Sequence, residues 1–186
     1  MTLLSSVPSA PVSTTAAATA AGCPPGIIDL EASGFGRQSY PIEVGFVLGD
    51  GSSYCTLIIP APTWTHWDAS AEQVHHISRE TLHKHGRHVN EVAQQLNARL
   101  RGQTLYSDGW AHDFTWLATL FEEAGMVPLF RIDSLRRLLN DDEAARWGAA
   151  KDRVGSECSL ARHRASVDAW LLQQTWLRVK SEPSSL

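Results

Sequence analysis

Two acidic residues stand close together in an apolar segment near the start of the chain. Asp29 and Glu31 lie among Ile27, Ile28 and Leu30, a composition that is typical of a buried β-strand. Side chains two residues apart on a strand point to the same face. Two buried carboxylates repel each other, and burying them without a partner is costly. A divalent cation bound between their oxygens would remove the repulsion, so the pair predicts a metal site.

Two later segments offer further ligands for such a site. Asp108 and Asp113 follow a short apolar stretch, and Asp168 stands five residues after His163. Leu117 follows Asp113 at helical spacing, which favours Asp113 over Asp108 as the ligand. Mg²⁺ or Mn²⁺ best suits a site built from oxygen ligands.

The order and spacing of these residues resemble the DEDD exonuclease superfamily in its histidine subtype, whose members include proofreading exonuclease subunits. The shared pattern is an Asp-x-Glu pair, a middle Asp, and a His followed five residues later by an Asp. Residues 40–47 resemble the second strand of the family, 76–78 its His-Gly-Ile-(Ser/Thr) turn, and 132–134 a later strand. The resemblance runs from about residue 26 to 176, which is most of the chain.

The sequence departs from the family at two places. His75-His76 lacks the glycine of the usual His-Gly dipeptide. Before the middle Asp, members commonly show His-Asn-x-x-Phe-Asp, whereas this chain has Asp-Gly-Trp-Ala-His-Asp at 108–113. Asp113 keeps the ligand position, but the changed residues before it leave the substrate preference open.

The resemblance implies a 3′→5′ exonuclease that releases nucleoside monophosphates from nucleic-acid 3′ ends by a two-metal-ion mechanism. Asp29 would bridge the two ions, and Asp113 would hold the second. Glu31 and Asp168 would complete the first. Because an imidazole titrates near neutral pH, His163 is predicted to be the general base. A regular helix would separate His163 and Asp168 by about 140°, so we expect His163 in the loop before a helix and Asp168 in its first turn.

Residues around this site are predicted to contact the substrate. The ring of Phe35 either stacks on the terminal base or folds onto the core. Backbone amides of 32–34 would bind the 3′ hydroxyl or sugar, the turn at 76–77 would lie beside the groove, and two arginines beside His163 would contact phosphates. The predicted substrate-binding residues are Ala32, Ser33, Gly34, Phe35, His76, Ile77, Arg162 and Arg164.

A dense group of histidines follows the third predicted strand. Zinc binding is one interpretation, but the group has no cysteine partners, which favours a solvated turn and helix surface. The histidines are His75, His76, His83, His85 and His88.

Composition and charge narrow the functional classes. The chain has 186 residues, 43% hydrophobic and 19% charged, with a net charge of −4, which fits one globular domain. The acidic balance argues against binding long duplexes through many phosphates and favours short or single-stranded ends. Cys23, Cys55 and Cys158 show no disulfide or zinc pattern, so a reducing, cytoplasmic setting is expected. No apolar run approaches membrane-spanning length, so no membrane partner is expected.

The expected organisation is one domain between two tails. Residues 1–24 carry no charged side chain and are rich in Ala, Ser, Thr and Pro, which predicts a disordered tail. An exonuclease domain is predicted over 25–180, followed by a short polar tail at 181–186.

The apolar periodicity predicts a mixed α/β domain. The helix that begins near 111 is expected to bury Phe114, Leu117 and Phe121, and Ser134 to cap a further helix. The first three strands should form an antiparallel meander, and the family resemblance implies a ribonuclease H-like five-stranded mixed sheet flanked by helices. Strands are expected at 27–31, 42–48, 54–59, 104–107 and 129–132, and helices at 89–100, at 111–125 and from 165 onward.

Two other functions are compatible with the same fold. One is a non-catalytic module that binds nucleic acid or assembles with other proteins, which the complete acid set and His163 argue against. The other is an accessory proofreading subunit associated with a polymerase, which ranks below a free-standing enzyme because no separate tether domain is apparent. No residue pattern distinguishes DNA from RNA.

Overall fold

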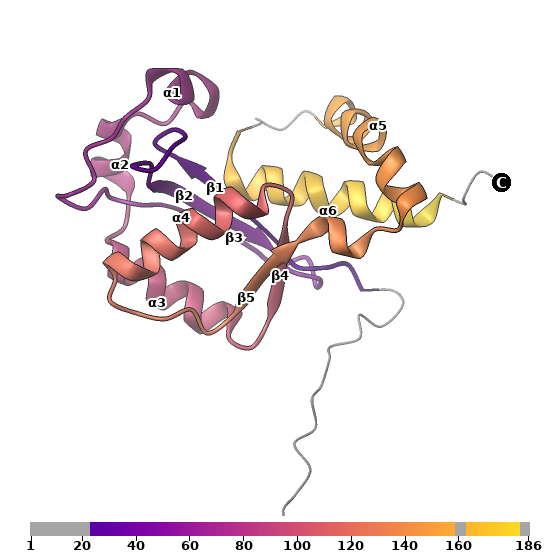
Figure 1. Cartoon of the computed structure of the whole chain (residues 1–186), viewed down its shortest axis with the longest axis horizontal. Coiled ribbons are helices and arrows are strands. Elements are labelled where there is room, and N and C mark those ends of the chain that lie inside the picture. Colours follow the sequence, from indigo (N-terminus) through magenta and orange to yellow (C-terminus); the bar gives the residue numbers. More distant parts are fainter. Residues whose placement is uncertain (1–22, 159–162, 183–186) are drawn as a thin grey trace, which may run out of the picture.

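A five-stranded mixed sheet forms the centre of the protein (Figure 1). The computed structural model describes residues 23–158 and 163–182. The strands are β1 (Ile27–Ala32), β2 (Pro41–Val47), β3 (Ser53–Leu57), β4 (Thr104–Ser107) and β5 (Arg131–Ser134). Their order is β3-β2-β1-β4-β5, with β1, β2 and β3 antiparallel and β4 and β5 parallel to β1. This topology confirms the predicted α/β class and the initial antiparallel meander.

Helices cover both faces of the sheet. They are α1 (Ala69–His75), α2 (Arg79–His85), α3 (Val89–Leu100), α4 (Trp110–Glu123), the 3₁₀ helix η1 (Leu135–Leu138), α5 (Asp141–Glu157) and α6 (Ala165–Ser181). One face packs against α3 and α4, and the other packs against α6, on which α5 lies (Figure 1). No helix in the described ranges is long and apolar enough to cross a lipid bilayer.

The central strand β1 divides its side chains between the core and a functional face. Ile28 and Leu30 are buried in the core beneath α3 and α4, whereas Ile27 packs against α6. Because side chains alternate along a strand, Asp29 and Glu31 share the α6 face with Ile27. The apolar residues therefore fix the direction in which both acids point.

The last strand begins two residues later than predicted. The amide of Leu129 donates to Asn97 Oδ1 at 2.7 Å, and the carbonyl of Leu129 accepts from the Gly102 amide at 2.8 Å. These contacts bind residue 129 to the end of α3 and the turn after it, and pairing with β4 starts only at Arg131. The other predicted strand ends lie within two residues of the observed ones, and β4 matches its predicted range at both ends.

Two predictions about helices were wrong. Phe114 is 51% exposed rather than buried, because Asp113 takes the inward position on α4 and the next residue is rotated by about 100°. Ser134 precedes η1 but its side chain caps no helix. The long helix α5 is instead capped by Asn140, whose side chain accepts from the amide of Glu143 while the Glu143 side chain accepts from the amide of Asn140.

Gly45 allows α6 to approach the sheet closely. A Cβ atom on Gly45 would lie 2.5 Å from the carbonyl carbon of Ala165 and 2.7 Å from the Cα of Ser166. Gly45 is also the residue of β2 that pairs with Asp29. The missing side chain therefore brings the start of α6 directly over the strand that carries the acid pair.

We expect Gly45→Ala to lower the free energy of unfolding by about 1–3 kcal/mol, because the added methyl must push α6 away from β2. Urea unfolding followed by circular dichroism would measure the change. Gly148→Ala is the matched control: nothing lies within 4 Å of a Cβ atom there, and alanine stabilises a helix interior by roughly 0.5–1 kcal/mol over glycine. Unchanged stability of Gly45→Ala would contradict the close contact.

Candidate metal and active site

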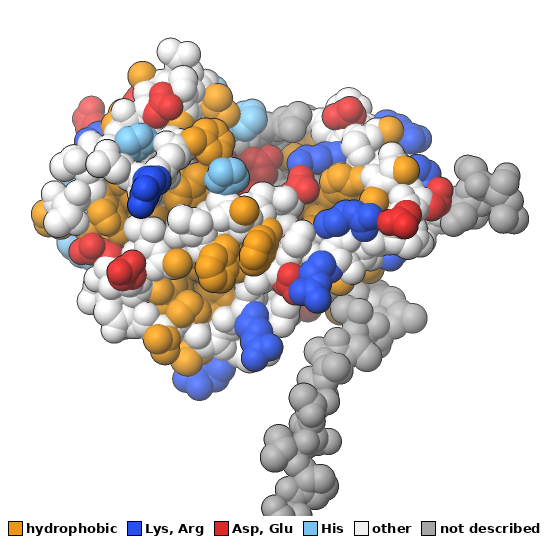
Figure 2. All heavy atoms as spheres, in the orientation of Figure 1, with side chains coloured by type: hydrophobic (Ala, Val, Ile, Leu, Met, Phe, Trp, Pro, Cys, Tyr) orange, Lys and Arg blue, Asp and Glu red, His pale blue; other side chains and the backbone are white. Residues whose placement is uncertain are grey.

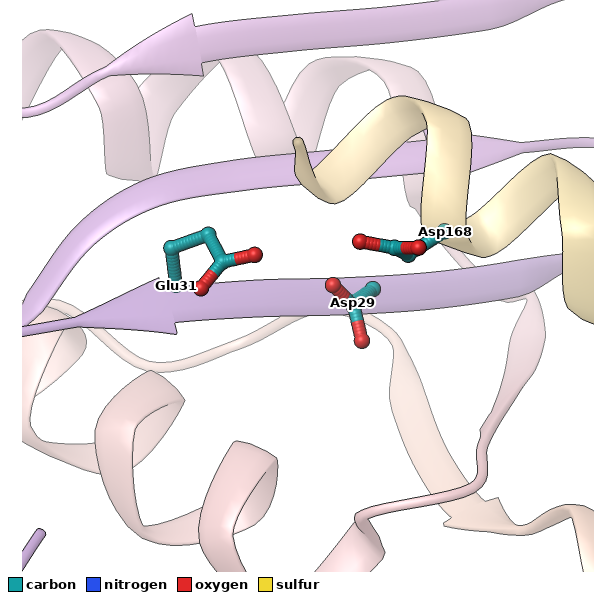
Figure 3. A group of neighbouring side chains, drawn as sticks. All are labelled: Asp29, Glu31 and Asp168. Carbon is teal, nitrogen blue, oxygen red and sulfur yellow. The ribbon is translucent and has the colours of Figure 1, made fainter. Parts of the chain in front are cut away.

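Three carboxylates from β1 and α6 converge on one point. One oxygen each from Asp29, Glu31 and Asp168 lies within 4.8 Å of the other two. Figure 3 shows the two strand residues facing the first turns of α6, from which Asp168 projects toward them. Within the described residues, no other group of histidine, cysteine or acidic side chains has this compactness. The structure thus brings together three of the four predicted ligands, and the histidine group forms no such cluster.

The fourth predicted ligand, Asp113, lies in the same cleft but outside this three-residue group. It is 3% exposed on the first turn of α4. Its carboxylate accepts hydrogen bonds from the Ser107 hydroxyl and from the backbone of Leu30. Its rival Asp108 is more exposed and pairs with Lys151 on α5. Asp113 is therefore held beside β1, whereas Asp108 stands at the side of the cleft.

The carboxylates line a cleft of about 370 Å³. Figure 2 shows acidic side chains in the hollow between the surfaces formed by α4 and α5. The aromatic side of the cleft includes His112 and Trp116 of α4, whose rings stack with their centroids 5.6 Å apart. Lys151 and His163 also line it. The cleft therefore combines an acidic floor with an aromatic wall.

Burial and mutual repulsion disfavour the ionised forms of these acids. Burial raises the pKa of Asp29 well above its ordinary value, and the neighbouring charges of Asp113 and Glu31 raise it further. Burial, followed by the charge of Asp168, raises the pKa of Glu31 to about 7. Burial also raises the pKa of Asp113 to about 7, although its hydrogen bonds oppose the shift. A hard cation would relieve this repulsion, so the all-oxygen cluster fits a divalent ion.

His163 lies in the loop before α6 and Asp168 in the first turn of that helix, as predicted. The backbone of His163 has a left-handed φ of 62°, and the residue is exposed at the cleft. The loop position allows His163 and Asp168 to line one cleft even though a regular helix would point them apart.

Glu43, which the sequence analysis did not single out, anchors the start of α6. It is fully buried on β2, opposite Glu31. Its carboxylate accepts from Nε and Nη2 of Arg164 at 2.9 and 2.6 Å, and from the amide of Ala165 at 2.9 Å. The Arg164 side chain remains 47% exposed in this ion pair, and its contact with a phosphate stays a prediction. Arg162 lies outside the described residues.

A sequence signal for Glu43 existed. It interrupts an apolar strand, and the alternation that directs Ile42 and Val44 into the main core places Glu43 and Gly45 on the opposite face. These two residues lie on the same face of the sheet as Asp29 and Glu31. An acid and a glycine at such positions indicate that a helix packs closely against this face. For Lys151 the sequence leaves two interpretations open, a cation that lines a cleft and a lysine on a solvated helix surface.

Phe35 forms part of the cleft wall. It is 69% exposed, and its ring centroid lies 5.3 Å from that of His112 and 6.0 Å from that of Trp116. The alternative that it folds onto the core is therefore wrong. Ala32 and Gly34 lie with Phe35 around a small adjoining pocket of about 160 Å³.

Ser33 is occupied by contacts within its own loop. Its amide donates to the Tyr40 carbonyl at 2.9 Å, and its hydroxyl lies 3.0 Å from His66 Nδ1. This corrects the prediction that the Ser33 amide binds a ligand. Gly34 has a φ of 139°, and a Cβ atom there would lie 2.6 Å from Cβ of Asp68, so the loop requires glycine at this position.

The turn after α1 presents a different histidine from the one predicted. His76 ends α1 in a left-handed conformation and faces a separate depression, and Ile77 is buried in the core. The buried His75 instead lines the small pocket beside Phe35. Its Nδ1 accepts from the Ile77 amide at 3.0 Å, and its Nε2 has no hydrogen-bond partner among the described residues. Burial lowers the pKa of His75, which favours the neutral ring.

No protein-family profile and no curated protein sequence matches this chain. Solved structures of exonuclease I, by contrast, have a similar fold. A zinc-bound exonuclease I from E. coli in complex with single-stranded DNA superposes with a TM-score of 0.65 at 11% identity, over 84% of this chain and 40% of that one. An apo exonuclease I gives a TM-score of 0.64 at 10% identity, over 84% of this chain and 42% of that one.

A moderately thermophilic exonuclease I from Methylocaldum szegediense gives a TM-score of 0.61 at 11% identity, over 86% of this chain and 41% of that one. This chain thus spans about two fifths of the length of these proteins. At this identity the likeness concerns the fold, and it confirms the ribonuclease H-like arrangement of the sheet and its helices.

Without divalent cations, we expect the protein to lose stability as the pH rises from about 5 to 7. The folded-state pKa values of Glu31 and Asp113, about 7, lie above the ordinary values of 4.5 and 3.8. The folded state therefore favours the protonated forms, and this contribution to stability is complete below the ordinary pKa values and lost as the pH passes through 7. Urea unfolding at several pH values in EDTA would measure the trend.

Two additions make this experiment specific to the cluster. Glu31→Gln should weaken the decline, because it removes one of the titrating groups. Mg²⁺ or Mn²⁺ should stabilise the wild type more at pH 7 than at pH 5, where protonation competes with binding. A decline of the same size in Glu31→Gln would contradict the role of Glu31.

Proposed function

We propose that this protein is a metal-dependent 3′→5′ exonuclease that hydrolyses phosphodiester bonds at single-stranded nucleic-acid 3′ ends and releases nucleoside monophosphates. The observation that carries the proposal is the convergence of Asp29, Glu31 and Asp168, with the buried Asp113 beside them, on one cleft. The likeness in fold to an exonuclease I bound to single-stranded DNA supports this class of reaction.

The donor set fits two divalent ions, Mg²⁺ or Mn²⁺, because all its ligand atoms are carboxylate oxygens. Asp29, Glu31 and Asp168 would hold one ion, and Asp113 would hold the second together with Asp29. When bound, the ions would neutralise the phosphate and lower the pKa of the attacking water.

The remaining residues of the cleft take up the proton of the attacking water and contact the nucleic-acid strand. An imidazole nitrogen of His163, at the edge of the cleft, accepts the proton of the attacking water. The exposed ring of Phe35 offers a face on which a terminal base of any identity stacks. The net charge of −4 disfavours the many phosphate contacts of a long duplex, so a single-stranded end is the preferred substrate.

Asp29→Asn is expected to lower the rate of hydrolysis at least about 100-fold, because it removes a direct ligand and even indirect partners of a metal contribute 10–100-fold. The same change should preserve or raise stability at pH 7 in EDTA, because it removes a buried charge. End-labelled DNA and RNA, single- and double-stranded, digested with Mg²⁺ or Mn²⁺, would measure the activity.

Asp50→Asn is the matched control, since Asp50 lies exposed in the turn between β2 and β3 and bonds to Ser52. It should leave hydrolysis unchanged. Shortening from the 5′ end, or cleavage that persists in EDTA, would contradict the proposal. Strand binding by the wild type without any cleavage would instead favour a non-catalytic nucleic-acid-binding module.

His163→Asn is expected to lower kcat by about 10²–10⁴-fold, the usual contribution of a general base. Stabilisation of the fold by Mn²⁺ should remain, because the carboxylates are unchanged. Asp29→Asn should lose both the activity and most of this stabilisation. Measuring kcat together with thermal unfolding, with and without Mn²⁺, separates the role of general base from that of metal ligand. An unchanged kcat in His163→Asn would exclude His163 as the base.

A further inference from the structure

Lys151 on α5 forms an ion pair with Asp108, which lies in the loop between β4 and α4. Its Nζ lies 2.5 Å from Asp108 Oδ2, and both side chains are 38% exposed. Lys151 and Asp108 line the same cleft as the carboxylate cluster. The pair therefore joins α5 to the loop between β4 and α4 at the side of the cleft.

A cation at this position would offset the negative charge of the cleft for an incoming nucleic-acid strand. The floor of the cleft is acidic, and a nucleic-acid strand is anionic along its whole length. Arg164, the other cation close to the cluster, is bound to the buried Glu43. Of the lysines and arginines that the structure describes, Lys151 lines the cleft, and its charge lowers the pKa of Asp29.

The ion pair itself is easily exchanged. Half-exposed ion pairs contribute little to stability, because water solvates both partners when they separate. A lysine has a flexible stem and a compact charge that binds phosphate as a point charge. A phosphate entering the cleft can therefore replace Asp108 as the partner of Lys151 without disturbing α5.

We propose that Lys151 binds the phosphate next to the scissile one in the substrate strand, and that Asp108 holds its ammonium over the cleft until the strand arrives. This inference rests on the proposed exonuclease function. The scissile phosphate faces the carboxylate cluster and its ions, whereas the ammonium of Lys151 is held at the side of the cleft by Asp108. A strand that continues past the cluster brings its next phosphate to this side. Lys151 is thus a specificity-determining residue that favours polynucleotides over single nucleotide esters.

Lys151→Gln tests the contact through its dependence on salt. With a single-stranded oligonucleotide, we expect KM to rise about tenfold, the effect of losing one charge-assisted hydrogen bond. The slope of log(1/KM) against log[salt] should become less steep by about 0.7, the value for one phosphate of a single strand. Lys151→Arg should restore most of both effects. Asp108→Asn should keep the full slope with an equal or lower KM.

Arg87→Gln is the matched control, because Arg87 pairs with Glu91 and does not line the cleft. It should change neither KM nor the slope. The p-nitrophenyl ester of thymidine 5′-monophosphate offers a single phosphodiester and no neighbouring phosphate. Lys151→Gln should therefore lose less kcat/KM on this ester than on the oligonucleotide.

The outcomes separate the two proposals. If the wild type hydrolyses the oligonucleotide but Lys151→Gln keeps its KM and salt slope, Lys151 is a structural ion-pair partner and the inference is overturned. An equal loss on both substrates also overturns it, because Lys151 would then act at the scissile phosphate. If the wild type hydrolyses neither substrate with Mg²⁺ or Mn²⁺, the proposed function itself fails.

Discussion

The attachment of α6 to β2 decides where the last carboxylate of the site stands. Gly45 lacks the Cβ atom that would hold the helix away from the sheet. Glu43, two residues before it, binds the Arg164 side chain and the Ala165 amide at the start of the helix. Asp168 follows within one turn and is carried over β1, where the helix dipole also favours a negative charge. A shift of this helix would leave the two acids of β1 without their third partner.

The same attachment adds to the electrostatic strain of the site. Glu43 lies opposite Glu31, and its charge raises the Glu31 pKa after the effects of burial and Asp168. Arg164 opposes this shift at Glu31, and Lys151 opposes the shift at Asp29. Burial and repulsion outweigh both cations. The cluster therefore costs folding free energy and is arranged to receive positive charge, a trade of stability for binding that is common at functional sites.

The strand β1 serves the core and the site at once because its side chains alternate. Ile28 and Leu30 contribute to the main core, and the alternating residues Asp29 and Glu31 form part of the site. A register shift of one residue would move the acids into the core and the apolar residues into the cleft. The burial of Ile28 and Leu30 on one face of β1 thus fixes the position of the acids on the other face. The packing of these two apolar residues therefore determines where the carboxylates of the candidate metal site lie.

Local sequence patterns predicted which acids would lie together and which strands and long helices carry them. Each of these patterns lies within a few consecutive residues. They are an acid pair with strand spacing, an acid at the start of a helix, and a histidine before a helix whose first turn carries an acid. The helices α1 and α2, with seven residues each, were not predicted because so short a segment shows no clear helical period.

Tertiary structure alone decided the partners of these residues. Arg164 meets Glu43 across 121 residues of sequence, and Lys151 meets Asp108 across 43. Arg164 anchors a helix, whereas Lys151 lines the cleft. Periodicity gives the direction of a side chain relative to its own strand or helix. Its partner depends on how separate elements pack, and that packing is set by the summed burial of many residues rather than by any local pattern.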